Sequence, residues 1–121
     1  MVMLSTVLVV EDDETLRTLM AEAIAVLGLG VIDCANADDA LALLESTPVI
    51  ALVVTDINMP GSMNGVKLAT IIWQRWPGLP VIVTSGNERA QKDQFPPHVS
   101  FLAKPWSLAA FHSAVRRSLS S

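Results

Sequence analysis

The feature that most constrains the fold is the alternation of short β-branched, apolar runs with longer stretches of helical period. The first run is apolar almost throughout, as expected for a strand that is covered on both faces. The five runs are Thr6–Val10, Val31–Ala35, Val49–Thr55, Pro80–Ser85 and Val99–Ala103. Because strands that alternate with helices form βα units, we expect an α/β fold with a doubly wound, five-stranded parallel sheet and helices on both faces.

Apolar residues at helical spacing predict the helices between these strands. Their inward faces are Leu16, Leu19, Met20, Ala23 and Leu27; Ala37, Ala40, Leu41 and Leu44; Val66, Ala69, Ile72 and Trp76; and Leu108, Phe111, Val115 and Leu119. Asn36 or Asp38 is the candidate N-cap of the second helix, and Ser107 that of the last. Between the fourth and fifth strands, Glu88–Phe95 is polar and only weakly helical, so we do not expect a full helix there.

Composition limits the classes of protein that fit. A chain of 121 residues, 51% hydrophobic and 17% charged, is long enough for one folded domain over residues 1–121 and too apolar for disorder. The formal net charge of −4 argues against a nucleic-acid surface. Met1–Ser5 lacks a secretory signal, the apolar runs are too short to span a bilayer, and the single cysteine, Cys34, fits a reducing compartment. We expect a cytoplasmic protein with no membrane partner.

Polar side chains follow the predicted strands where a ligand would bind. In an open parallel sheet, ligands bind outside the carboxyl ends of the strands. Those ends carry Glu11-Asp12-Asp13, Asp56, Ser85 and Lys104. Carboxylates packed together repel and raise one another's pKa, and a hard cation with oxygen ligands removes the conflict, which predicts Mg²⁺ or Mn²⁺. Cys34, His98 and His112 form no zinc-ligand spacing.

Each of these residues also has an ordinary interpretation. Asp13 is a candidate helix cap, Lys104-Pro105 fits a common loop, and Ser85 could satisfy a backbone group. Four such residues at four functional strand ends are not independent, so we favour the joint interpretation as one site.

Four segments in this order resemble the receiver domain of two-component response regulators: Val7–Asp13, Thr55–Gly61, Val81–Gly86 and Phe101–Pro105. The resemblance implies a flavodoxin-like strand order of 2-1-3-4-5. It also implies that Asp56 is the phosphoryl acceptor. Asp12 would then ligate the metal directly, Glu11 mainly through metal-bound water, and Asn58 through its backbone carbonyl.

The same resemblance implies roles for the remaining residues. Ser85 and Lys104 would contact the phosphoryl oxygens, Lys104-Pro105 would be a cis peptide, and Phe101 would be the switch aromatic. Asn58 and Asn87 would tune the lifetime of the phosphoryl group. The donor would be a histidine kinase or a phosphotransfer protein, and the output partner stays open. A homodimer is among the candidate assemblies.

Three departures from the family pattern bear on these expectations. The loop from Gly61 to Gly65 is one residue longer than the commonest form of the family, and Phe101 lacks the hydroxyl of a tyrosine. The segment between Ser85 and Phe101 is short and contains Pro96-Pro97. We expect Glu88–Trp106 to be the output face and its polar part to be the most mobile region of the domain.

Two other classes of function share parts of this pattern. A metal-dependent phosphohydrolase of the haloacid-dehalogenase type would need a second aspartate two residues after the nucleophile, where this chain has Asn58. A receiver-like module that is never phosphorylated would have no use for buried like charges. We therefore expect no enzyme beyond assistance to its own phosphorylation and dephosphorylation.

Overall fold

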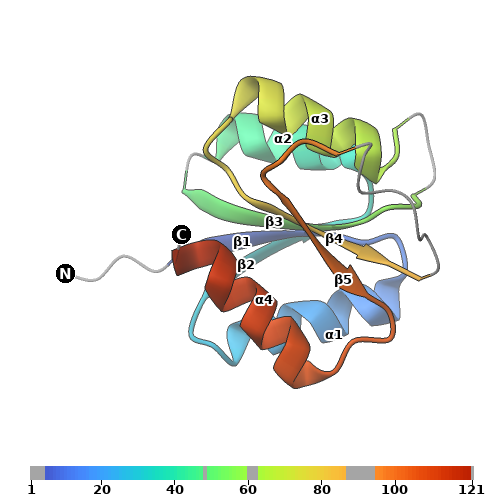
Figure 1. Cartoon of the computed structure of the whole chain (residues 1–121), viewed down its shortest axis with the longest axis vertical. Coiled ribbons are helices and arrows are strands. Elements are labelled where there is room, and N and C mark those ends of the chain that lie inside the picture. Colours follow the sequence, from blue (N-terminus) through green and yellow to red (C-terminus); the bar gives the residue numbers. More distant parts are fainter. Residues whose placement is uncertain (1–4, 48, 60–62, 87–94, 121) are drawn as a thin grey trace.

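The computed structural model describes residues 5–47, 49–59, 63–86 and 95–120, and these form a three-layered α/β domain (Figure 1). The strands are β1 (Thr6–Val10), β2 (Gly30–Cys34), β3 (Ile50–Asp56), β4 (Val81–Ser85) and β5 (Val99–Ala103). All neighbouring strands pair in parallel, in the order β2-β1-β3-β4-β5. The predicted fold class and strand order are therefore confirmed.

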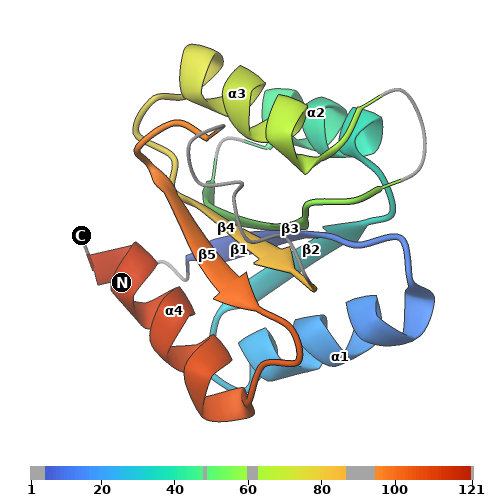
Figure 2. The same cartoon turned by 45° about the vertical axis from the view of Figure 1, so that its right-hand side comes forward.

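The helices of the described residues lie on both faces of the sheet (Figures 1 and 2). One face carries α1 (Glu14–Ala25) and α4 (Leu108–Ser120), and the other carries α2 (Ala37–Ser46) and α3 (Gly65–Arg75). Successive strand residues point to opposite faces, so each central strand feeds two cores. Leu8 and Val10 of β1 pack on the α2–α3 side, whereas Val7 and Val9 pack on the α1–α4 side.

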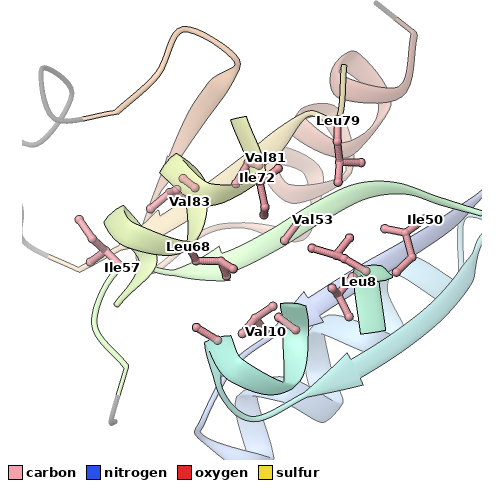
Figure 3. Close-up of a cluster of buried hydrophobic side chains, with 14 residues drawn as sticks. Leu8, Val10, Ile50, Val53, Ile57, Leu68, Ile72, Leu79, Val81 and Val83 are labelled. Carbon is pink, nitrogen blue, oxygen red and sulfur yellow. The ribbon is translucent and has the colours of Figure 1, made fainter. Parts of the chain in front are cut away.

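The core on the α2–α3 side is formed by strand side chains that pack against both helices (Figure 3). It includes Leu8, Val10 and Val53 from the sheet and Leu68 and Ile72 from α3, all five fully buried, and α2 adds Ala37, Ala40 and Leu44. Burial of both faces explains why β1 is apolar from Val7 to Val10. The acidic residues lie at the carboxyl ends of these strands, where they are outside the two cores.

The helix caps agree with the sequence for three helices. Asp13 caps α1, since its Oδ1 accepts a hydrogen bond from the Leu16 amide at 2.9 Å. Asn36, and not Asp38, caps α2, because its Oδ1 accepts from the Asp39 amide at 2.8 Å. The Ser107 hydroxyl accepts from the Ala110 amide at 3.0 Å at the start of α4.

Several predicted boundaries and faces were wrong in detail. β2 runs over Gly30–Cys34 and β3 begins at Ile50, which leaves Val49 outside the strand and 49% exposed. Leu108, which was predicted to be buried, is 53% exposed, and the first buried residue of α4 is Phe111. The ring of Phe111 stacks on that of Trp106, with 4.5 Å between the ring centroids.

Leu19 is also 53% exposed, and Met20, Ala23 and Ile24 are the buried residues of α1. The predicted inward face of this helix is therefore correct at Met20 and Ala23, wrong at Leu19, and lacks Ile24. The question of a helix before β5 concerns residues 87–94, which lie outside the described residues.

The start of α3 rests directly on the backbone at the end of β3. The Gly65 amide donates a hydrogen bond to the Ile57 carbonyl at 2.9 Å. A Cβ atom at position 65 would collide with the Asp56 carbonyl oxygen and lie 2.9 Å from the Ile57 Cα. Glycine is thus required here by a close approach of two backbones, which holds the start of α3 against Asp56 and Ile57.

We expect Gly65→Ala to lower the free energy of unfolding by about 1–3 kcal/mol, the usual cost of forcing extra atoms into a packed site. Gly78→Ala is the matched control, because a Cβ there meets nothing within 4 Å. Urea unfolding of both variants measures the difference. Equal stabilities would contradict the close approach.

Candidate functional site

The carboxyl edge of the sheet gathers three carboxylates. Glu11 directly follows β1, Asp12 comes next, and Asp56 is the last residue of β3. One oxygen from each side chain lies within 4.8 Å of the other two. Glu11 and Asp56 are buried, with exposed fractions of 1% and 9%, whereas Asp12 is exposed. The acidic cluster predicted from three separate positions therefore forms.

Lys104 reaches this cluster from the end of β5. Its Nζ lies 2.8 Å from Asp56 Oδ2 and 3.8 Å from Glu11 Oε1. The Lys104 amide donates to the Ser85 carbonyl at 2.8 Å, which extends the β4–β5 pairing by one residue. The Lys104–Pro105 peptide is cis, as the resemblance implied. One ammonium thus contacts two of the three carboxylates.

The pKa values of Glu11 and Lys104 are both raised, for different reasons. Burial raises the pKa of Glu11, and the charge of Asp56 and a side-chain hydrogen bond with Asp12 add to the rise, although the Asp13 amide and Lys104 oppose it. Burial by itself lowers the pKa of Lys104. The hydrogen bond to Asp56 and the charges of Asp56 and Glu11 outweigh that effect, and the Lys104 pKa is raised. The Lys104 ammonium therefore stays protonated, beside carboxyl groups whose negative charges repel one another.

The donor set fits a hard divalent cation. Glu11 Oε2 accepts a hydrogen bond from the Asp13 amide at 3.0 Å, but buried Oε1 has no hydrogen-bond partner within the part of the chain described. Glu11, Asp12 and Asp56 offer only carboxylate oxygens, which suit Mg²⁺ or Mn²⁺. Among residues 5–47, 49–59, 63–86 and 95–120, this is the one cluster of potential metal ligands.

The other predicted residues lie around this cluster at different depths. Ser85 is buried at the end of β4, beside Ala103 of β5. Asn58 is exposed, and its backbone amide donates to Asp56 Oδ1 at 3.5 Å. Phe101 is half-buried in β5, and its ring meets that of Phe95 edge-on at 5.0 Å. Asn87 and the loop residues 60–62 lie outside the described residues.

One polar contact at the site was missed from the sequence. Arg17 of α1 donates from Nη1 to the Glu11 carbonyl at 2.8 Å, and its Nε lies 3.8 Å from Asp33 Oδ1 at the end of β2. The signal that the sequence offered was an arginine one helical turn after the cap residue Asp13. Gly65 was missed as well, because its role depends on a backbone contact that leaves no mark in the side-chain pattern.

Comparison with known proteins agrees with this geometry. The model of the response regulator receiver domain family matches residues 7–116, which is nearly the whole chain. The chain belongs to this family. The receiver interpretation is thus confirmed, and with it the expectation of a signalling domain that accepts a phosphoryl group.

Two similar proteins are regulators that are longer than this chain. The chain is 32% identical to the response regulator protein FleR of Pseudomonas aeruginosa, over 95% of this chain and 24% of FleR. It is 35% identical to the DNA-binding transcriptional regulator NtrC of Salmonella typhimurium, over 93% of this chain and 24% of NtrC. The chain therefore spans about a quarter of the length of these relatives.

A solved structure supports the fold independently. The response regulator receiver protein from Sinorhizobium medicae superposes with a TM-score of 0.91, covering 98% of this chain and 96% of that one. The identity between the two is 24%. That likeness therefore confirms the receiver fold and says nothing further about partners.

We expect Glu11→Gln to stabilise the metal-free protein at pH 7 by about 1–2 kcal/mol, because it removes a buried charge beside two other carboxylates. The raised folded-state pKa of Glu11 means that ionisation costs folding free energy. The cost is absent below the unfolded pKa and grows as pH rises through the folded pKa. The advantage of the variant should therefore vanish near pH 4.

Urea unfolding in the presence of a chelator, at both pH values, measures this difference. Glu22→Gln, at an exposed position of α1, is the matched control and should change little at either pH. A Glu11→Gln protein less stable than wild type at pH 7 would contradict a costly buried charge.

Proposed function

We propose that Asp56 accepts a phosphoryl group from a histidine kinase or a phosphotransfer protein, with Mg²⁺ or Mn²⁺ bound beside it, and that the product switches the domain to control a partner. The observation that carries the proposal is the pairing of Asp56 Oδ2 with Lys104 Nζ at 2.8 Å, next to Glu11 Oε1, which lies 3.8 Å from the same ammonium and accepts no hydrogen bond from the described residues. A reactive carboxylate, a fixed cation and spare oxygen ligands for a metal then share one edge of the sheet.

Glu11, Asp12 and Asp56 are the side chains that would hold the cation, with the Asn58 carbonyl as a further ligand. When bound, the ion supplies positive charge to the phosphoryl oxygens. Phosphoryl transfer depends mainly on positioning and on neutralising charge, so the protein needs little other chemistry. The absence of a second carboxylate at Asn58 argues against general acid catalysis on other substrates.

The transfer itself forms one bond and breaks another. An Asp56 carboxylate oxygen attacks phosphorus in line, an oxygen–phosphorus bond forms, and the nitrogen–phosphorus bond to the donor histidine breaks. Lys104 already lies within hydrogen-bond distance of Asp56 Oδ2. A small movement of its ammonium would pair it with a phosphoryl oxygen, so Lys104 is proposed to stabilise both the free and the phosphorylated site.

The product would act on Ser85 and Phe101. New phosphoryl oxygens at the end of β3 would accept a hydrogen bond from the buried Ser85 hydroxyl. The half-buried Phe101 ring would then move inward and leave its edge-on contact with Phe95. The shift can be no larger than the difference in contact free energy between the two states. Asn58 and Asn87 are proposed to set how long the phosphoryl group lasts.

The assembly and location of the domain are proposed from its relatives. FleR and NtrC are regulators in which the matching part is about a quarter of the chain, so this receiver acts either alone or inside a longer protein. A homodimer is a further candidate. None of the helices in the described ranges could cross a membrane. We place the function in the cytoplasm, without direct contact to nucleic acid.

The test of the acceptor is intact mass after incubation with acetyl phosphate and Mg²⁺. We expect wild type to gain one phosphoryl group, because Asp56 is the carboxylate of the cluster that lies within hydrogen-bond distance of Lys104. Asp56→Asn should gain none, and Asp38→Asn, at an exposed position of α2, should behave as wild type. Full phosphorylation of Asp56→Asn would refute the assignment.

The test of the cation ligands is calorimetric titration with Mg²⁺. We expect Asp12→Ala to bind at least tenfold more weakly, because one of three clustered carboxylates is lost. Trp106 offers a second readout by fluorescence, since it lines the same surface cavity as Lys104, with Trp73 and Trp76 as background. Affinity equal to that of wild type would remove Asp12 from the site.

A further inference from the structure

Arg17 ties the acidic segment to two other elements. From the second turn of α1, its Nη1 donates to the Glu11 carbonyl at 2.8 Å, while its Nε lies 3.8 Å from the Asp33 carboxylate at the end of β2. The Arg17 side chain is 21% exposed and that of Asp33 46% exposed. The guanidinium therefore joins the turn after β1, the helix α1 and the neighbouring strand.

Besides Arg17, the turn is held by hydrogen bonds of its own residues, by a bond to β2 and by the ion pair of Glu11 with Lys104. The Glu11 amide donates to the Cys34 carbonyl at 3.0 Å, the Asp13 amide to Glu11 Oε2 at 3.0 Å, and the Leu16 amide to Asp13 Oδ1 at 2.9 Å. Two of these bonds depend on carboxylates of the acidic segment. Arg17 contributes a positively charged donor to the Glu11 carbonyl, which those bonds leave unbound.

A restraint at this point has a consequence for cation binding. Three carboxylates within 4.8 Å repel one another in the metal-free protein, and Lys104 offsets that repulsion only for Asp56 and Glu11. Without an anchor, the turn would relax away from β3 and would have to be drawn back by the ion. Contacts that orient ligands in advance raise metal affinity because this reorganisation is avoided.

We propose that Arg17 is a positioning residue of the cation site, which holds Glu11 and Asp12 in their binding arrangement through the Glu11 carbonyl. This inference rests on the proposed function, since it requires that the carboxylates bind Mg²⁺. Asp33 has the secondary role of keeping the guanidinium over the turn. Arg17 does not touch the phosphoryl group, so it affects the concentration of Mg²⁺ that is needed and not the transfer at saturating Mg²⁺.

The alternative is that Arg17 only stabilises the fold. Loss of the side chain would then lower the free energy of unfolding and leave Mg²⁺ affinity unchanged. The two roles separate in three measurements: Mg²⁺ affinity by calorimetry, hydrogen exchange of the Asp13 and Leu16 amides in the metal-free protein, and the urea midpoint. The variants are Arg17→Gln, Arg17→Lys and Asp33→Asn. Arg75→Gln is the control for the loss of a surface ion pair, because Arg75 pairs with Glu45 at 3.3 Å, away from the acidic cluster.

We expect Arg17→Gln to weaken Mg²⁺ binding about tenfold, the lower end of what loss of an outer contact costs a metal site. Asp33→Asn should cost about two- to threefold, as for a partly exposed ion pair, and Arg17→Lys should fall between these variants. The Asp13 and Leu16 amides should exchange faster in Arg17→Gln, and the rate of phosphorylation at saturating Mg²⁺ should equal that of wild type. Arg75→Gln should match wild type in all of these.

A lower urea midpoint in Arg17→Gln together with unchanged Mg²⁺ affinity would overturn the positioning role. Unchanged exchange of the Asp13 and Leu16 amides would overturn the restraint on the turn. If wild type itself bound no Mg²⁺, the proposed cation site would fail first, and that result is distinct from either of the others.

Discussion

The contact between the Lys104 ammonium and the Asp56 carboxylate joins parts of the chain that are far apart in sequence, and the site depends on it. In the strand order, β4 lies between β3 and β5, so Lys104 spans the end of β4 to reach Asp56 at 2.8 Å. The same ammonium lies 3.8 Å from Glu11, after β1. Without the lysine ammonium, Glu11 and Asp56 would be two buried like charges with no counter-charge. The desolvation of each would cost roughly several kcal/mol of folding free energy.

Much of the fold was predictable because burial on two faces leaves a strong mark in the sequence. Val7, Leu8, Val9 and Val10 form a continuous apolar run only because both faces of β1 are covered. The convergence of Glu11, Asp56 and Lys104 followed from parallel topology, which brings every carboxyl end to one edge. Leu108 was placed wrongly because helical spacing gives the face of a helix and not how far its first turn is covered.

Other parts of the site were not predictable, for reasons that differ from residue to residue. Arg17 binds a backbone carbonyl, and no side-chain pattern records which carbonyl a long flexible arginine will reach. Gly65 is required by a backbone contact across the β3–α3 connection, which appears only once the chain is folded. Both residues act on the turns that carry the acids. The sequence thus showed the reactive groups but not the residues that hold their backbones in place.

The missing side chain at Gly65 has a practical consequence for anyone who would move this site to another protein. Copying Glu11, Asp12, Asp56 and Lys104 into a different α/β sheet would transfer the charges but not the spacing between the helix and the strand end. In this domain that spacing equals the contact distance of two backbones, since even one methyl group would collide with the Asp56 carbonyl. A transplanted site would therefore have to include a glycine at the first residue of the following helix, and a scaffold whose helix sits farther from the sheet would need to be rebuilt before any acid was introduced.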